Sequence, residues 1–465
     1  MSAPPLFPHP ASDRGELTAT ARLAWPLVLG GLAQVAIHTT DVLILGRYSV
    51  DALAASALGL NLMWAFAIFG IGVMTAVAPL VSAERGRARH SVREVRRTVR
   101  QGLWAALIVT LPMWLVLWNA DMLFALLGQD ADLSADATRF VRIAMWGILP
   151  FLMFIVLRCF VTALERPLSA LWVTGGGVLL NILVCVPLVF GVGDWRGLGL
   201  EGAAIANAVA NGFLFVGLAA VVSLDRRFRR FHLFGRWWRA DWPRLAQVMR
   251  LGLPIGVTLA LEVTVFNAAV FLMGVIGKPS LAAHAVAIQI ASLAFQIPFG
   301  IAQASTVRVG LAHGRQDRAG VARAGRVAIL MGFAVAAMLS LAIALAATPL
   351  VELFIDRNDP SASAAFALAV QFTLVAALFQ LVDATQAIGA AVLRGIQDTR
   401  WPMLFAAFGY WVVGFAVAWT LAFRTDLAGV GVWLGLAVGL AVVSVLMLAR
   451  WFLRERLGLL RYPAT

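Results

Sequence analysis

Long runs of apolar residues alternate with short polar stretches along almost the whole chain. The apolar runs are roughly 20 residues long, which is the length of an α-helix that crosses the hydrocarbon core of a bilayer. Because a chain in lipid must satisfy its backbone hydrogen bonds internally, such runs are expected to be helices. We therefore predict an all-α integral membrane fold with twelve transmembrane helices. They are placed at residues 22–46, 52–83, 100–127, 136–164, 168–192, 201–224, 246–276, 280–311, 322–349, 362–393, 402–423 and 428–453.

Composition supports a membrane protein. Of the 465 residues, 61% are hydrophobic and 13% charged, whereas soluble domains carry about 25% charged residues. Residues 1–21 contain four prolines followed by charged residues, and they lack the apolar core of a secretory signal peptide. Cys159 and Cys185 lie inside apolar runs without paired spacing, so we interpret them as small buried hydrophobes rather than a disulfide or metal site.

The positive charges are distributed unevenly between the two sides of the predicted spans. The formal net charge is +13, and 30 of the 37 lysine and arginine residues fall in the tails or in the alternate connections after the second, fourth, sixth, eighth and tenth spans, including the flanking ends of the spans. This asymmetry is typical of cytoplasmic loops in membrane proteins, and it argues against nucleic-acid binding. We therefore expect a multi-pass protein of the bacterial inner membrane with both termini in the cytoplasm. The seven residues on the other side are Arg47, Arg139, Arg142, Arg196, Lys278, Arg357 and Arg424.

The two halves of the chain resemble each other at one constant offset. Leu23 and Pro26 of the first half align at this offset with Leu251 and Pro254 of the second. Near the ends of the halves the offset grows by a single position. Because each half contains six helices, both halves begin on the same side of the membrane and form parallel repeats. The same constant offset also aligns Val35 with Val263, Gly46 with Gly274, Gly72 with Gly300 and Gly86 with Gly314.

This repeat predicts two six-helix lobes around a central cavity. Lobes that rock against each other can expose a site near the middle of the membrane to either side in turn, which is how many secondary transporters work. The predicted organisation is a cytoplasmic tail at 1–21, an N-lobe at 22–224, a basic cytoplasmic linker at 225–245, a C-lobe at 246–453 and a cytoplasmic tail at 454–465.

Three acidic residues lie well inside the predicted spans: Asp41, Glu262 and Asp383. A charged side chain at the centre of a membrane helix costs roughly 2.5–3.5 kcal/mol on insertion scales, so each requires a reason. Gln34, His38 and Asp41 share one helix face because of their spacing. His38 is then either a proton relay or a side chain held in place by a hydrogen bond.

Aromatic and amide side chains accompany the two acids of the second half. Phe266 follows Glu262 by one helical turn, and Phe379 and Gln380 precede Asp383. Carboxylate oxygens suit a hard monovalent cation or a proton, and ring faces attract organic cations. Alternatively, each acid only forms a hydrogen bond to a neighbouring helix. Further polar residues that line a cavity or join helices are Asn181, Asn207, Asn211, Gln289, Gln296 and Gln303.

Long stretches of the chain carry a pattern shared with one transporter family. The first span contains Trp25-Pro26, Gln34 and Asp41-Val42. Residues 251–266 read LGLPIGVTLALEVTVF, residues 281–310 read LAAHAVAIQIASLAFQIPFGIAQASTVRVG, and residues 381–399 read LVDATQAIGAAVLRGIQDT. These stretches resemble the multidrug and toxic compound extrusion family, and within it the NorM-type bacterial branch. The resemblance covers essentially the whole chain.

The resemblance implies a function and a set of residues. Asp41 would be the N-lobe carboxylate used in coupling, and Glu262 with Asp383 would form the C-lobe cation site, which holds Na⁺ if the protein is sodium-coupled. The implied substrates are lipophilic or cationic drugs exported in exchange for Na⁺ or H⁺, with no other cofactor. This chain departs from the family at two positions, because Cys185 replaces an aspartate common one turn after Asn181 and Phe379 replaces a tyrosine found in some members.

Other functions fit the residues less well. A lipid-linked oligosaccharide flippase shares the two-bundle plan in related families, but it needs basic residues near the middle of the membrane, where this chain has acids. We expect no enzyme, because no metal-binding histidine pair, no serine with a base and no nucleotide-binding glycine loop is present. A channel is also disfavoured, because nothing in the sequence resembles a repeated selectivity filter. We expect a monomer in the lipid bilayer that binds small molecules and no nucleic acid.

Overall fold

The predicted all-α membrane fold is confirmed. The structure, a computed structural model, describes residues 12–87, 91–235, 238–357, 362–460 and 462. In this part of the chain, twelve helical spans are long and apolar enough to cross a membrane. Three of them are divided further. The second span consists of α2 and α3, the fourth consists of α6, a short 3₁₀ turn η1, and α7, and the eleventh consists of α16, the π-helical η2, and α17.

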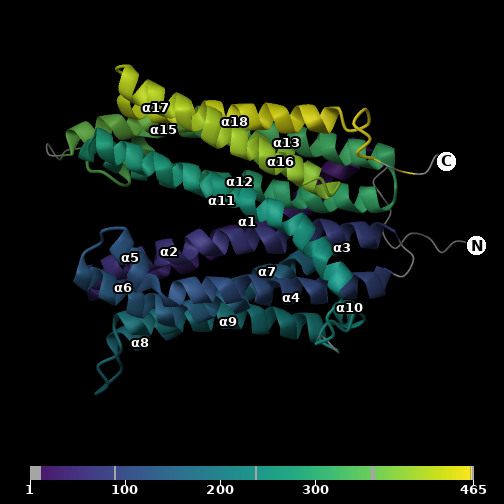
Figure 1. Cartoon of the computed structure of the whole chain (residues 1–465), viewed down its shortest axis with the longest axis horizontal. Coiled ribbons are helices and arrows are strands. Elements are labelled where there is room, and N and C mark those ends of the chain that lie inside the picture. The colour runs from purple at the N-terminus through teal and green to yellow at the C-terminus, as the bar shows by residue number, and fades with distance from the viewer. Residues whose placement is uncertain (1–11, 88–90, 236–237, 358–361, 461, 463–465) are drawn as a thin grey trace, which may run out of the picture. The chain divides into compact units, whose positions relative to one another are not determined.

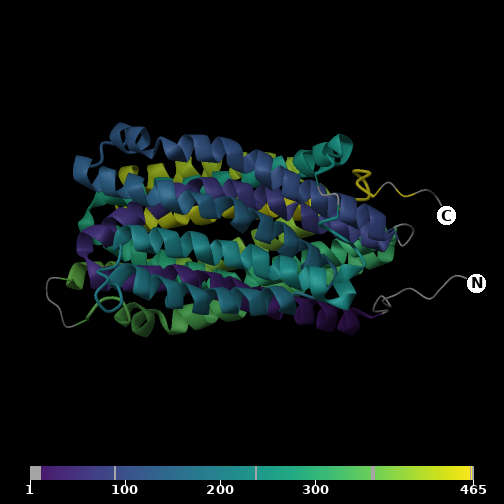
Figure 2. The ribbon, with the colours of Figure 1, turned by 90° about the horizontal axis from the view of Figure 1, so that it is seen from below.

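The long helices within each compact part of the chain run roughly parallel to one another (Figures 1 and 2). The first half of the chain contains α1 (Asp13–Tyr48), α2 (Val50–Thr75), α3 (Val77–Gly86), α4 (Ser91–Trp118), α5 (Ala120–Leu126), α6 (Ala131–Ala144), η1 (Met145–Gly147), α7 (Ile148–Ala163), α8 (Leu168–Phe190), α9 (Leu200–Leu224) and α10 (Arg226–Arg229). The second half contains α11 (Trp242–Ile276), α12 (Lys278–Gly314), α13 (Arg318–Leu345), α14 (Ala347–Glu352), α15 (Ser363–Gly395), α16 (Arg400–Ala406), the π-helical η2 (Ala407–Gly414), α17 (Phe415–Arg424) and α18 (Ala428–Phe452).

Two predicted spans were misplaced by more than two helical turns. The first span begins at Asp13 instead of residue 22, so part of the expected tail is helical. The third span covers Ser91–Trp118 instead of 100–127. Its polar start extends the helix beyond the apolar run, and at its end the side-chain amide of Asn119 donates to the carbonyl of Leu115 at 2.8 Å before α5 begins. Residues 1–11 of the N-terminal tail, 236–237 of the linker, and 461 and 463–465 of the C-terminal tail lie outside the described residues.

Contacts divide the chain into two compact units. The N-unit runs from Leu29 to Arg85 and from α4 to Gly256, and the C-unit contains α1 up to Val28, a short stretch at Gly86, and the chain from Val257 onward. The N-unit therefore contains the start of α11, and the C-unit contains the start of α1. The division into lobes at the predicted linker stays a prediction.

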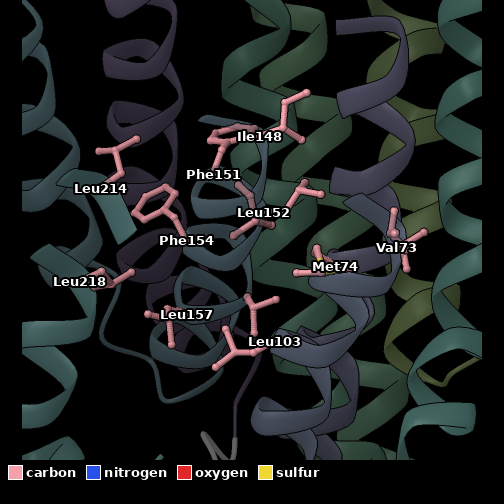
Figure 3. Packing of buried hydrophobic residues seen from close by; sticks show 14 of the residues in the cluster. Val73, Met74, Leu103, Ile148, Phe151, Leu152, Phe154, Leu157, Leu214 and Leu218 are labelled. Atoms are coloured by element: carbon pink, nitrogen blue, oxygen red, sulfur yellow. The ribbon is translucent and has the colours of Figure 1, made fainter. Parts of the chain in front are cut away.

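The core of the N-unit is built around α7. The side chains of Leu152, Phe154 and Leu157 are almost completely buried, and Figure 3 shows them between Val73 and Met74 of α2 on one side and residues of α9 on the other. Because nearly every residue of α7 is apolar, the helix can be surrounded by other helices. It thereby forms a rigid wall beside the polar residues described below.

The core of the C-unit is built around α15, which packs on α12 and on α18. Phe372, Phe379 and Trp433 are among its largest fully buried side chains. In this unit, α1 begins and α18 ends at the same end (Figure 1). The packed α15 and α18 position the acidic and aromatic residues of the second repeat.

Close helix contacts hold the exchanged starts of α1 and α11. In the N-unit, a Cβ atom on Gly72 of α2 would lie 2.5 Å from the Cα atom of Gly256 in α11, so only glycine fits there. In the C-unit, a Cβ atom on Gly300 of α12 would lie 3.0 Å from the backbone nitrogen of Val28 in α1. Gly72 and Gly300 are equivalent positions at the constant offset of the repeat. The two repeats therefore use the same position to receive the first half-helix of the opposite repeat.

Candidate functional site

A cavity in the N-unit brings together several of the polar residues singled out from the sequence. It contains about 560 Å³ of non-atom space, including its open mouth. Gln34 and His38 of α1 and Asn207 and Asn211 of α9 line it. The remaining lining is Ile37, Leu60, Met63, Trp64, Ala67, Ile148 and Phe151. An apolar wall with a few polar groups is the usual composition of a small-molecule site.

Asp41 is held by asparagines at the edge of this cavity. Its side chain is buried, and its two carboxylate oxygens accept hydrogen bonds from the Asn181 amide at 2.7 Å and the Asn207 amide at 3.3 Å. Asn211 donates in turn to Asn207 at 3.0 Å. Asn207 thus contacts both the carboxylate and the cavity. Cys185 of α8 is fully buried within electrostatic reach of Asp41.

His38 is fixed by an aromatic neighbour. The indole N–H of Trp64 in α2 donates to Nε2 of His38, and the ring centroids lie 5.2 Å apart. Phe151 packs edge-on against Trp64 at 6.1 Å. Of the two readings of His38, the geometry favours the held side chain over the relay, because Nε2 is already used as an acceptor. Trp64 was not singled out from the sequence, since an aromatic residue in an apolar run gives no signal of its own.

The acids of the second repeat meet in the C-unit. Asp383 is buried with one carboxylate oxygen lacking a hydrogen-bond partner, and Glu262 is half-buried within electrostatic reach of it. Arg394 of α15 and Tyr410 of η2 also interact electrostatically with Glu262. The Tyr410 hydroxyl has no hydrogen bond of ordinary geometry.

The position of Tyr410 depends on glycines that the sequence pattern did not reveal. A Cβ atom on Gly409 would lie 3.0 Å from the carbonyl oxygen of Gly439 in α18, and one on Gly414 would lie 3.1 Å from the Cα atom of Gly439. The π-helical turn of η2 therefore lies directly against α18. Such π-helical stretches are often found at functional sites. Phe379 has no hydroxyl group, but Tyr410 provides a phenol oxygen elsewhere in the C-unit.

Aromatic rings form a continuous row beside these acids. Phe266 packs edge-on against Phe379 at 5.9 Å, and Phe379 packs edge-on against Trp433 at 5.6 Å. His284 of α12 lies 5.4 Å from Trp433, measured between ring centroids. Of these rings, only Phe266 and Phe379 were singled out as candidate cavity residues.

Several buried polar atoms near the acids of the C-unit have no hydrogen-bond partner among the described residues. Within the part of the chain that the structure describes, no hydrogen-bond partner reaches the two ring nitrogens of His284, the two amide atoms of Gln380 or the indole nitrogen of Trp433, all of which are buried. Unpaired buried polar groups are costly and call for water or an ion. Among these atoms the Gln380 amide oxygen, together with the carboxylates of Asp383 and Glu262, is an oxygen ligand of the kind that suits a hard cation. Gln289 is exposed and Gln296 is half-buried, so the glutamine stripe of α12 does not lie at one depth.

Comparisons with known proteins agree over most of the chain. A model of the MatE family matches residues 26–186 and 254–420, one segment in each repeat. A probable multidrug resistance protein NorM from Mesorhizobium japonicum is 48% identical over 96% of this chain and 95% of that protein. One of the same name from Brucella suis is 45% identical over 94% of this chain and 93% of its own length.

Solved structures share the fold. The crystal structure of the eukaryotic MATE transporter AtDTX14 superposes with a TM-score of 0.87 at 20% identity, covering 97% of this chain and 98% of that chain. A multidrug resistance MATE family transporter of the MOP superfamily in an outward-facing conformation gives a TM-score of 0.84 at 19% identity, covering 96% and 97%. At these identities the likeness concerns the fold alone.

Proposed function

Because the chain belongs to the MatE family of membrane transporters and to its NorM group of multidrug efflux proteins, we propose that it is an antiporter. It exports lipophilic or cationic drugs and takes up Na⁺ or H⁺ in exchange. The observation that carries this proposal is that Asp41 and Asp383 form no ion pair among the described residues, and that Glu262 interacts with Arg394 only at longer range. A membrane protein that retains unpaired acids inside its spans uses them to bind a positive charge.

The coupling step is competition for these acids. A cation that neutralises a carboxylate weakens its attraction for a cationic drug, so ion uptake favours drug release. A ligand can shift a conformational equilibrium only by its different affinity for the two states. Shared carboxylates provide that difference when rocking lobes open to opposite sides. The oxygen donors around Asp383 suit either ion: a proton binds one carboxylate, and Na⁺ also uses neighbouring amide and phenol oxygens.

The cavity of the N-unit supports drug binding over flipping of a lipid-linked sugar. Trp64, Met63 and Phe151 offer an aromatic and deformable surface to a flat drug. A pyrophosphate would need basic side chains, and the described cavity lining contains neither lysine nor arginine. Drug export is therefore the function that we propose, and oligosaccharide flipping is the alternative that the chemistry of the cavity disfavours.

The test is drug transport by the purified protein in liposomes with sodium and proton gradients imposed separately. We expect one gradient to drive transport and the variants Glu262→Gln, Asp383→Asn and Asp41→Asn to lose it by about tenfold or more, since a lost charge interaction of about 1.4 kcal/mol corresponds to a factor of ten. Asp51→Asn is the matched control, because Asp51 is exposed in the first turn of α2. Full gradient-driven transport by all three variants would contradict the proposal.

A further inference from the structure

A fully buried ion pair joins the start of α1 to α12 in the C-unit. The Arg308 side chain donates from Nε and Nη2 to the two carboxylate oxygens of Glu16, both at 2.7 Å. Side-chain exposure is 5% for Arg308 and 0% for Glu16. Two parallel charge-assisted hydrogen bonds of this kind fix both distance and orientation. The residues lie at the predicted cytoplasmic ends of their helices.

The N-unit contains a corresponding cluster at the start of α11. Arg244 donates to Glu84 of α3 at 3.2 Å and forms an ion pair with Glu94 of α4. Arg97 of α4 binds Glu94 at 2.9 Å and Asp241, just before α11, at 2.7 Å. The hydrogen bond from Arg97 holds the pKa of the Asp241 carboxyl below its usual range, so this carboxylate stays ionised at neutral pH. Arg244 and Glu84 are about as buried as Arg308.

The two clusters occupy equivalent places in the repeat. Glu16 aligns with Arg244 at the same constant offset that relates Gly72 to Gly300. Each belongs to the first half-helix of one repeat, and each is bound by a helix of the opposite repeat. The charges are reversed, because the first repeat presents an acid and the second a base. The sequence comparison aligned these half-helices but gave no sign that their charges pair across the repeats.

Buried ion pairs of this type hold a particular arrangement rather than add much net stability. Removing two charges from water offsets most of their attraction, whereas removing one partner leaves a buried charge and is strongly destabilising. A pair that separates at a helix end can be hydrated by the cytoplasm. The pair is therefore sensitive to whether its two helices stay together.

We propose that Glu16, Arg308 and Arg244 are positioning residues that hold the cytoplasmic half of each first helix against the opposite repeat and thereby set the balance between conformations. The inference rests on the proposed rocking of two lobes. Opening toward the cytoplasm requires α1 to leave α12 and α11 to leave α2 and α4. The cluster at α1 opposes the first of these separations, and the cluster at α11 opposes the second.

The test measures cytoplasmic exposure of a cysteine placed at the α1–α12 contact. Ala24→Cys serves as the reporter, because Ala24 is buried and its carbonyl oxygen lies next to Gly300. The native Cys159 and Cys185 are replaced by alanine. Inside-out vesicles are treated with a membrane-impermeant maleimide, without drug or gradient. We expect Glu16→Gln to raise the labelling rate by at least about tenfold, since breaking one buried partner is a large effect.

A second ion pair on the same helix is the matched control. Asp13 of α1 pairs with Arg326 of α13 at 3.0 Å, and both side chains are exposed. Exposed pairs contribute little, so Asp13→Asn should leave labelling nearly unchanged. The charge exchange Glu16→Arg with Arg308→Glu should return labelling toward the original rate, which a merely structural defect would not do.

Three results would overturn the inference. The first is a labelling rate in Glu16→Gln that equals that of the protein carrying only the reporter cysteine. The second is a labelling rate in Asp13→Asn as high as that in Glu16→Gln, and the third is a charge exchange that does not return the rate toward the original. If Glu16→Gln does not fold, Glu84→Gln with Val73→Cys asks the same question in the N-unit, because Val73 packs on Gly252 at the α2–α11 contact. Labelling needs no transport, so it is independent of the antiport test. Gradient-driven transport by the acid variants would refute the proposed function and leave the labelling result standing.

Discussion

At the scale of single residues, the N-unit cavity depends on side chains that hold one another. Trp64 has only one polar group, and its indole N–H is used to fix His38. The same ring faces the cavity and packs on Phe151. Trp64 thus both shapes the cavity wall and sets which atom of His38 remains available. We expect it to act on drug binding rather than on the coupling ion.

Trp64→Phe tests this role. The substitution keeps an aromatic wall but removes the N–H donor, so His38 loses its fixed orientation. We expect the KM for drug transport to rise severalfold, since one lost hydrogen bond is worth about 0.5–1.5 kcal/mol, with little change in kcat. Trp172→Phe is the control, because Trp172 on α8 is 77% exposed and lies outside the cavity lining. A change confined to kcat would assign Trp64 to the coupling step instead.

At the scale of helices, glycines set how closely the exchanged half-helices approach. Gly72 contacts Gly256 through backbone atoms, and Gly300 contacts Val28. A backbone cannot move aside as a flexible side chain can, so an added methyl group must push the helices apart. The glycine contacts and the buried ion pairs therefore restrain the same pairs of helices.

Gly72→Ala is predicted to lower the thermal stability of the purified protein. Overpacking of a tight contact typically costs about 1–3 kcal/mol, which here corresponds to a Tm lower by a few degrees. Gly175→Ala on α8 is the control, since no atom lies within 4 Å of an added Cβ there. That control should match or exceed the original Tm, because alanine favours a helix over glycine. Equal Tm values for all three proteins would show that the α2–α11 contact is looser than the structure indicates.

At the scale of the whole molecule, an even number of spans places both termini on one side. The structure contains twelve candidate spans in its described residues. The positive charges favour the cytoplasm for that side. The topology stays a prediction, and with it the ion clusters of α1 and α11 are expected to lie on the cytoplasmic side. The side of the membrane on which these two clusters hold the helices together therefore depends on the topology.

Epitope tags at both ends test the topology. We expect protease to remove both tags from inside-out vesicles and neither from right-side-out vesicles. A tag inserted at Asp194, in the exposed connection between α8 and α9, should show the opposite pattern. Termini that differ in protection would mean an odd number of spans.

Much of this protein follows from the linear pattern. Apolar runs of membrane-spanning length predicted the twelve spans, because hydrophobic length is a local property that lipid selects directly. The constant offset revealed the repeat, and the cost of a buried charge singled out Asp41, Glu262 and Asp383 as candidate site residues, which they stay. The starts of α1 and α4 were missed because polar residues extend those helices ahead of the apolar run, where hydropathy carries no signal.

Only the tertiary structure decided which distant side chains meet. Asn181 and Asn207 converge on Asp41, Tyr410 reaches the neighbourhood of Glu262, and Glu16 pairs with Arg308. Each of these depends on how helices far apart in the chain pack. Charge, burial and helix length are properties of a segment and can be read from it. The partner of a side chain depends on the crossing of two helices, which the pattern of either one alone does not contain.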